Sequence, residues 1–203
     1  GVTKSIGLGL ISFGEVLDRL KPDLIIILGD RFEALAMATA ATIMGVPIMH
    51  LHGGEITEGA YDDSIRHAIT KFSHLHGVSS ESSRRRVIQL GEDPKHVFTI
   101  GALGIEHIYK NKLVSLSKIE KSIDFNLGKK FFLLAYHPAT YSNEKAESTI
   151  TNILSIVNEF PEYKLLITLA NADNGGRSIN AIIRKFEQKY PTQIKAISSL
   201  GSQ

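Results

Sequence analysis

The sequence predicts an α/β fold made of two Rossmann-like, doubly wound parallel-sheet domains. Short runs of β-branched and other apolar residues alternate with stretches of helical composition, which is the pattern of strands and crossover helices in a parallel sheet. This alternation stops over residues 109–129, which are polar and rich in lysine, and then resumes. We therefore expect one domain over residues 1–110 and a second over residues 111–203.

The first domain contains four predicted strands. Residues 24–28 (Leu-Ile-Ile-Ile-Leu) are a continuous apolar run, typical of a strand buried on both faces. Three more strands are expected at residues 47–51, 75–79 and 97–100. The helices between them are expected at residues 31–44, before Gly45; from Asp62 or Asp63 to about Ser73; and at residues 80–90, before Gly91.

The second domain repeats the pattern as a βαβαβ unit. Residues 109–129 form a linker or a connecting helix before it. The expected order is a strand at 130–136, a helix at 145–160, a strand at 164–169, a helix at 176–190 and a strand at 193–197. The chain begins at Gly1 without an initiator Met and ends just after the last predicted strand, so we expect an internal piece of a longer protein in which both domains are incomplete.

Composition excludes several classes of function. The 23 Lys and Arg residues nearly balance the 21 Asp and Glu residues, so the net charge of +2 supplies no drive toward nucleic acid or anionic membranes. The chain has no cysteine, which excludes disulfides, thiolate nucleophiles and zinc–thiolate sites. No apolar run approaches the roughly 20 residues that cross a bilayer. The triplet Arg84-Arg85-Arg86 lacks interleaved aromatic residues, so it indicates a solvated helix face.

Polar residues gather where the predicted strands end. Ligands of open α/β sheets bind at the carboxyl ends of the strands, so these segments are the candidate site. They are Gly29-Asp30-Arg31, residues 50–55 (His-Leu-His-Gly-Gly-Glu) with their continuation to His67, residues 101–104, residues 137–140 and residues 171–177. Since the strands themselves are almost purely apolar, this segregation is the strongest functional signal in the sequence.

Each segment also has a structural interpretation. Asp30 could cap a helix, Gly53-Gly54 could form only a turn, and one of the adjacent Asp62 and Asp63 could cap the helix that contains Arg66. Gly175-Gly176 could be a turn or could cradle a phosphate at a helix N-terminus.

The sequence contains residues that can bind metals, but it lacks the recognised motifs of metal and nucleotide-cofactor sites. Several residues are of metal-ligand type: His50, His52, Glu55, Asp62, Asp63 and His67. No H-E-x-x-H motif and no third histidine at a familiar ligand spacing accompany them, so we expect no metal site. The glycine-rich fingerprints of dinucleotide and nucleoside-triphosphate sites are also missing from the sequence, and we expect no cofactor.

Taken together, these motifs resemble those of the hydrolysing UDP-N-acetylglucosamine 2-epimerases of sialic acid biosynthesis. The segments that carry the resemblance are residues 29–33, 50–55, 62–71, 73–76, 85–92 and 101–104, His137-Pro138 and residues 171–173. The resemblance implies a two-domain GT-B-like fold with the active site in the cleft, and release of UDP and N-acetylmannosamine without a nicotinamide cofactor. It also implies an earlier Gly-Thr-Arg type loop and a later Ser-rich loop with an acidic residue, which this sequence lacks. We further expect a cytoplasmic homo-oligomer, a dimer or a tetramer, when the protein is intact.

The reaction itself dictates which groups are needed. Inversion at C2 removes a proton from one face of the sugar and returns one to the other. The simplest route is anti elimination of UDP to 2-acetamidoglucal followed by hydration. This route needs two acid/base groups and a donor for the departing diphosphate. Crowding of carboxylates at one sheet edge should raise the pKa of at least one of them.

The resemblance assigns roles to particular residues. The expected catalytic residues are Asp30, Glu55, Asp62 and His137. The expected substrate-binding residues are Arg31, His52, Arg66, Gly101, Asn171 and Asp173. Asp62 is preferred over Asp63 because it lies four residues before Arg66, which is the acid-to-Arg spacing of the family. Two alternatives remain: the same reaction on a UDP-linked 2,4-diacetamido-trideoxy sugar, and a non-catalytic nucleotide-sugar binder of the same fold.

Overall fold

The computed structural model describes residues 1–110, 113–138, 146–171 and 175–199. The chain is α/β and divides into two compact units, Gly1–Asn111 and Lys112–Gln203, which are described separately. The predicted strands, and the helices predicted between them, are all present to within two residues at each end. The α/β class and the two Rossmann-like parallel sheets are therefore confirmed.

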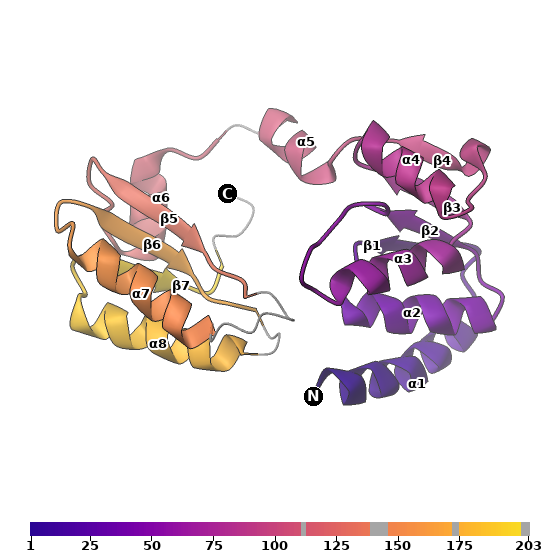
Figure 1. Ribbon diagram of the computed structural model, residues 1–203, viewed down its shortest axis with the longest axis horizontal. Coiled ribbons are helices and arrows are strands. Elements are labelled where there is room, and N and C mark those ends of the chain that lie inside the picture. Colours follow the sequence, from indigo (N-terminus) through magenta and orange to yellow (C-terminus); the bar gives the residue numbers. More distant parts are fainter. Residues whose placement is uncertain (111–112, 139–145, 172–174, 200–203) are drawn as a thin grey trace. The chain divides into compact units, whose positions relative to one another are not determined.

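The first unit contains one four-stranded parallel sheet. Its elements are α1 (Val2–Leu20), β1 (Ile25–Leu28), α2 (Phe32–Ile43), β2 (Ile48–Leu51), α3 (Asp62–Phe72), β3 (Leu75–Val78), α4 (Glu81–Gln89), the 3₁₀ turn η1 (Pro94–His96), β4 (Val97–Thr99) and α5 (Leu103–Lys110). The strand order β1-β2-β3-β4 follows the chain. Right-handed crossovers in such an order place the connecting helices on one face, and α2 and α3 lie together below the sheet in Figure 1.

Helix α1 is packed on the outer side of α2 (Figure 1). Small residues allow this close approach, because a Cβ atom at Gly9 would lie 3.2 Å from the Cβ of Ala36. The sequence analysis did not predict α1 or α5. Three glycines within α1, at positions 7, 9 and 14, weaken its helical signal, since glycine is a poor helix former.

The opposite face of this sheet is open in the described chain. Ile27 is buried against the helices, but Ile26 and Leu28 are 61% and 60% exposed. The prediction that residues 24–28 are buried on both faces is therefore wrong for the described chain, since β1 is an edge strand with helices on one side only.

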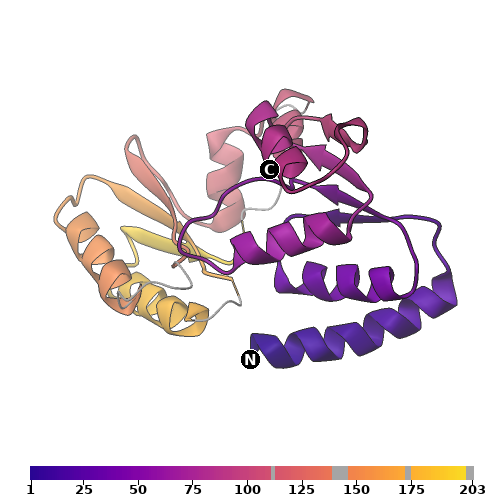
Figure 2. The same ribbon diagram turned by 45° about the vertical axis from the view of Figure 1, so that its right-hand side comes forward.

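The second unit contains a three-stranded parallel sheet in the order β5-β6-β7. Its elements are α6 (Leu116–Ile123), β5 (Phe131–Ala135), α7 (Ala146–Asn158), β6 (Lys164–Thr168), α8 (Gly176–Lys189) and β7 (Ile194–Ile197). Helices α7 and α8 lie side by side on one face of the sheet (Figures 1 and 2). In both sheets the spatial order of the described strands is the same as their order in the chain. The change of strand order that makes a sheet doubly wound therefore does not occur among the described strands.

No helix in the part of the chain that the structure describes combines the length and the apolarity needed to span a bilayer.

Candidate functional site

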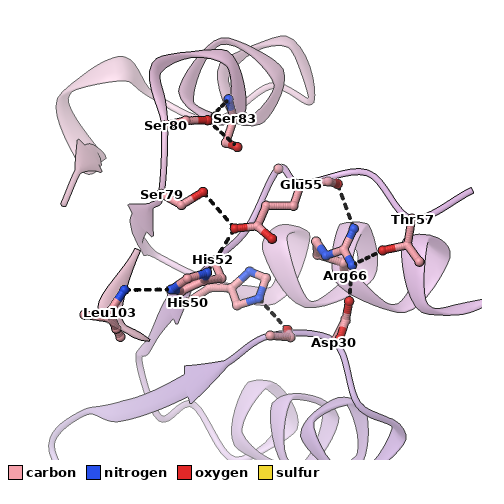
Figure 3. A network of polar contacts seen from close by, with 12 residues as sticks. Asp30, His50, His52, Glu55, Thr57, Arg66, Ser79, Ser80, Ser83 and Leu103 are labelled. Atoms are coloured by element: carbon pink, nitrogen blue, oxygen red, sulfur yellow. Dashed lines mark hydrogen bonds and ion pairs between the residues drawn. The ribbon is translucent and has the colours of Figure 1, made fainter. Parts of the chain in front are cut away.

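In the first unit, polar side chains converge at the carboxyl ends of the strands. They surround a cavity of about 320 Å³. Its lining residues are Leu28, Gly29, Asp30, His52, Glu55, Arg66, Leu103 and Gly104. Four of the predicted site residues, Asp30, His52, Glu55 and Arg66, are therefore brought together, as Figure 3 shows.

Arg66 is the centre of this cluster. Its side chain, on α3, is only 5% exposed and forms an ion pair with the carboxylate of Asp30. It also donates to the backbone carbonyl of Glu55 at 2.7 Å and to the Thr57 hydroxyl at 2.6 Å. Its donors are thus directed at the protein's own groups, and this geometry favours a positioning role over the predicted contact with substrate.

Asp63 belongs to the same network. Its Oδ1 atom accepts from the guanidinium of Arg66 at 3.2 Å and from the backbone N–H of Thr57 at 3.1 Å. Asp63 thus has a structural role, but it fixes Thr57 and Arg66 and is not the N-cap of α3, a position that Tyr61 occupies. Asp62 opens α3 one residue earlier, and its predicted catalytic role stays a prediction.

Glu55 is held by two donors on one oxygen. Its Oε1 atom accepts from the Ser79 hydroxyl at 2.7 Å and from Nδ1–H of His52 at 2.9 Å (Figure 3). Burial alone would raise the pKa of Glu55, but the hydrogen bonds from Ser79 and His52 outweigh it, and the pKa lies below its usual value. The expectation that crowding raises a carboxylate pKa is therefore not met at Glu55. An ionised Glu55 can act as a base at neutral pH.

His52 has an unusual backbone conformation. It has a φ of 63°, whereas the other described non-glycine residues with positive φ, Lys21 and Asp124, are the C-caps of helices. Its Nε2 atom accepts from the backbone N–H of Leu103, at 3.4 Å, so the ring links Glu55 to the first turn of α5. A left-handed residue away from a helix end stores backbone strain, which is found preferentially at functional sites.

The loop at Gly53-Gly54 is packed against α4. Gly54 has a φ of 77°, and a Cβ atom there would lie 2.4 Å from the backbone carbonyl oxygen of Ser83. Arg86 donates to the carbonyl of Gly54, while Arg84 donates to the carbonyls of Val97 and Pro94. The prediction of a solvated face is therefore wrong for Arg84 and Arg86, which hold loops in place, and fits only Arg85, which is exposed.

Arg31 and Gly101 lie near the same edge of the sheet. The guanidinium of Arg31 is half exposed and paired with Glu33 at 3.0 Å, and this hydrogen-bonded pair lowers the pKa of Glu33. Gly101 follows β4 with a φ of 82°, a conformation that favours glycine. Their predicted contacts with substrate stay predictions.

The second unit presents its predicted residues differently. His137 follows β5 and Asn171 follows β6, and both are exposed. The loop after β6 is fixed by Asn180, whose side chain bonds both the N–H and the carbonyl of Ala170, at 2.8 and 3.0 Å. Gly176 allows the close return of the chain, because a Cβ atom there would lie 2.2 Å from the carbonyl oxygen of Asn171. Asp173 lies outside the described residues.

Sequence reasoning missed two contributors to the site. Ser79 directly follows β3 at the same sheet edge, so its position was a usable signal, but the chain gives no indication that its hydroxyl reaches Glu55. Thr57 lies in the loop before α3 and carried no motif. Among the described residues, no group of three or more His, Asp or Glu side chains is arranged to hold a metal ion.

The chain is similar in sequence to one protein family and to curated members of it. The family model described as UDP-N-acetylglucosamine 2-epimerase matches residues 1–203. The GDP/UDP-N,N'-diacetylbacillosamine 2-epimerase (hydrolyzing) of Campylobacter jejuni is 40% identical over 98% of this chain and 52% of its own length. The UDP-N,N'-diacetylbacillosamine 2-epimerase (hydrolyzing) of Legionella pneumophila is 34% identical over 91% of this chain and 48% of its own. The chain thus spans about half the length of these relatives.

A solved structure shares the fold. The UDP-GlcNAc 2-epimerase from Neisseria meningitidis bound to UDP-GlcNAc superposes with a TM-score of 0.77 at 18% identity, over 98% of this chain and 55% of that one.

Proposed function

The chain belongs to the UDP-N-acetylglucosamine 2-epimerase family, and we propose that the complete protein hydrolyses a UDP-linked 2-acetamido sugar with inversion at C2. The main support for this proposal is that two carboxylates, Asp30 and Glu55, line one cavity and have different hydrogen-bond and ion-pair partners. Asp30 is paired with the cation of Arg66, while Glu55 accepts hydrogen bonds from Ser79 and His52. Two carboxylates in different environments are what a reaction with two proton transfers requires.

The first half of the reaction is an elimination. A base removes the C2 proton, the C1–C2 double bond forms, and the C1–O bond breaks with its electron pair leaving on UDP. Glu55, whose lowered pKa keeps it ionised at neutral pH, is the base in this assignment. His137, from the second unit, donates a proton or a hydrogen bond to the departing diphosphate.

The second half is hydration of the 2-acetamidoglucal. Water adds at C1, and C2 receives a proton on the face opposite to the one that lost it. Asp30 and Asp62 are the remaining carboxylates assigned to this step, with Arg66 fixing the orientation of Asp30. Arg31, His52, Gly101 and Asn171 stay the proposed substrate contacts, together with Asp173.

A second candidate substrate is a UDP-linked 2,4-diacetamido-trideoxy sugar. The identities of 40% and 34% to two proteins named for diacetylbacillosamine favour it over UDP-N-acetylglucosamine. The reaction at C1 and C2 is the same for both sugars, so the proton-transfer groups proposed above serve either one.

The test is product analysis. The complete protein is incubated separately with UDP-N-acetylglucosamine and with UDP-N,N'-diacetylbacillosamine, and release of UDP and of the free 2-epimeric sugar is followed by NMR. We expect turnover of one of them, and its loss in the Glu55→Gln variant. Tight binding of either nucleotide sugar without UDP release would contradict the enzyme assignment and indicate a non-catalytic binder.

A further inference from the structure

We propose that His50 is a positioning residue that sets the direction of Asp30 by holding the backbone carbonyl before it. This inference rests on the proposed function, because Asp30 is treated as a catalytic carboxylate. The sequence analysis considered His50 only as a metal-ligand type, and the reaction described above does not use it.

The contact with the Gly29 carbonyl carries the inference. His50 lies on β2, is completely buried, and its Nε2 atom is 2.8 Å from the carbonyl oxygen of Gly29. A carbonyl only accepts, so Nε2 bears the hydrogen. Gly29 has a φ of 74° at the point where the chain leaves β1. Because the Gly29 carbonyl and the Asp30 nitrogen share one peptide plane, this bond fixes how Asp30 leaves the strand.

A second contact of His50, with Thr70, is consistent with this tautomer. The Nδ1 atom is 3.1 Å from the hydroxyl of Thr70, which is also completely buried on α3. With hydrogen on Nε2, a neutral His50 accepts the Thr70 hydroxyl hydrogen at Nδ1. Burial lowers the pKa of His50 to about 4, so the ring stays neutral at the pH of catalysis. Its role is therefore geometric and not acid/base.

The loop that carries Glu55 rests on the same pair. A Cβ atom at Gly53 would lie 3.0 Å from Nδ1 of His50 and 3.1 Å from the Thr70 hydroxyl oxygen. The chain thus passes directly over the His50–Thr70 hydrogen bond. Figure 3 shows the His50 ring beneath this loop, bonded to the backbone at the start of the Asp30 loop. The loop of Glu55 is therefore packed on the Nδ1 side of the ring, whereas the Asp30 loop is held through Nε2, the contact that His50→Asn removes.

His76 supplies a matched control. It is the register partner of His50 on β3 and is equally buried. Its Nε2 atom, however, lies 3.2 Å from the carboxylate of Glu92, which also pairs with Lys71. None of these three residues lines the cavity. Substitution of His76 therefore perturbs the same buried face without touching the Asp30 loop.

The first experiment compares His50→Gln, His50→Asn and His76→Asn in the complete protein. Glutamine can place an amide N–H near the Nε2 position, whereas asparagine is one carbon too short. We expect His50→Asn to lose about 10²-fold in kcat with little change in KM, as small misplacements of reacting groups do. His50→Gln should recover most of this loss, and His76→Asn should retain kcat. Equal kcat losses in His50→Asn and His76→Asn would overturn the inference.

The second experiment repeats His50→Asn in an Asp30→Asn background. If His50 acts through Asp30, the second substitution adds no further loss of kcat, since the two sites are coupled. Losses that multiply would overturn the inference.

A third readout does not depend on turnover. The ¹⁵N NMR spectrum of wild-type His50 at pH 7 should report hydrogen on Nε2 alone, and hydrogen on Nδ1 would contradict the contact with Gly29. A wild-type protein that releases no UDP contradicts the proposed function, and the NMR readout separates that failure from a failure of the His50 contact.

Discussion

The two units have the same βα construction but differ in how they use polar side chains. In the first unit the buried polar or charged residues, among those described, are His50, Arg66, Thr70, Ser73, His76 and Ser83. In the second, the described part contains one, Gln193, which donates to the carbonyls of Val157, Phe160 and Tyr163 around the end of α7. The buried polar residues of the first unit include His50 and Arg66, which hold the loops after β1 and β2, whereas Gln193 in the second unit holds the segment that follows α7.

This difference has a consequence for catalysis. Groups fixed before substrate arrives need no reorganisation during the reaction, which makes preorganised sites effective. Glu55 and Asp30 are held in this way in the first unit, whereas His137 in the second is exposed. We therefore expect substitutions in the first unit to affect stability and chemistry together, and substitution of His137 to affect chemistry alone.

The largest expected effect is on the free energy of unfolding of the first unit in Arg66→Met. Removal of the guanidinium leaves Asp30 and Asp63 without their cation, and we expect a loss of about 3 kcal/mol, the lower end of the range for a broken buried pair. Urea unfolding measures it. The control is Arg184→Met in the second unit, whose half-exposed pair with Glu187 should be worth less than about 1 kcal/mol. Equal losses of unfolding free energy in the two variants would contradict the claim that buried polar contacts contribute more to the stability of the first unit than of the second.

The next prediction distinguishes the step in which His137 of the second unit acts from the step that needs a carboxylate of the first unit. We expect His137→Ala to lower kcat for UDP release by about 10²–10³, as loss of one donor to the developing negative charge does, without a change in Tm. It should still hydrate added 2-acetamidoglucal when UDP is supplied, because no diphosphate leaves in that half-reaction. Asp62→Asn should impair this hydration, because the carboxylate of Asp62 is assigned to that step. Equal damage to both half-reactions by both substitutions would make His137 a positioning residue.

A smaller effect is expected in the pH dependence of stability. Burial lowers the pKa of His50 from 6.5 to about 4, so between these values the unfolded chain binds a proton that the folded chain does not. The free energy of unfolding therefore falls as the pH drops through this window. Burial lowers the pKa of His76 in the same direction.

Denaturant unfolding at several pH values checks this prediction. In the His50→Gln variant the decrease between pH 6.5 and 4 should be smaller than in the wild type, with the remainder including the contribution of His76. Identical pH profiles of the two proteins would show that His50 is not buried as a neutral ring.

Much of the fold could be predicted because the strands are short apolar runs bounded by polar residues and glycine. The run at residues 24–28 predicted β1 correctly, yet its two-sided burial was wrong, since burial depends on neighbours that a single run does not specify. Helix α1 was missed because its three glycines weaken the helical signal, and it is stabilised by packing on α2, which the sequence does not specify.

The position of the candidate site could be predicted from the sequence, but the hydrogen bonds and ion pairs within it could not. Asp30 and Glu55 follow from their positions after strand ends, and Arg66 from its place in the helix that comes after the second of these loops. The pairing of Asp30 with Arg66 joins residues 36 positions apart, and the bond from Ser79 to Glu55 joins residues 24 apart. Such contacts decide whether an arginine binds substrate or holds a loop, and whether a carboxylate pKa rises or falls. They are set by the three-dimensional arrangement, and the hydrogen bonds from Ser79 and His52 are what lower the pKa of Glu55 against the effect of burial.

We propose above that carboxylates of the first unit exchange the C2 proton of a UDP-linked sugar. The most direct test is to run the reaction of the complete protein in deuterium oxide and to examine the released sugar by NMR and mass spectrometry. Elimination followed by hydration predicts a deuterium atom at C2 of the inverted product. A released sugar that keeps its original C2 hydrogen would contradict the claim.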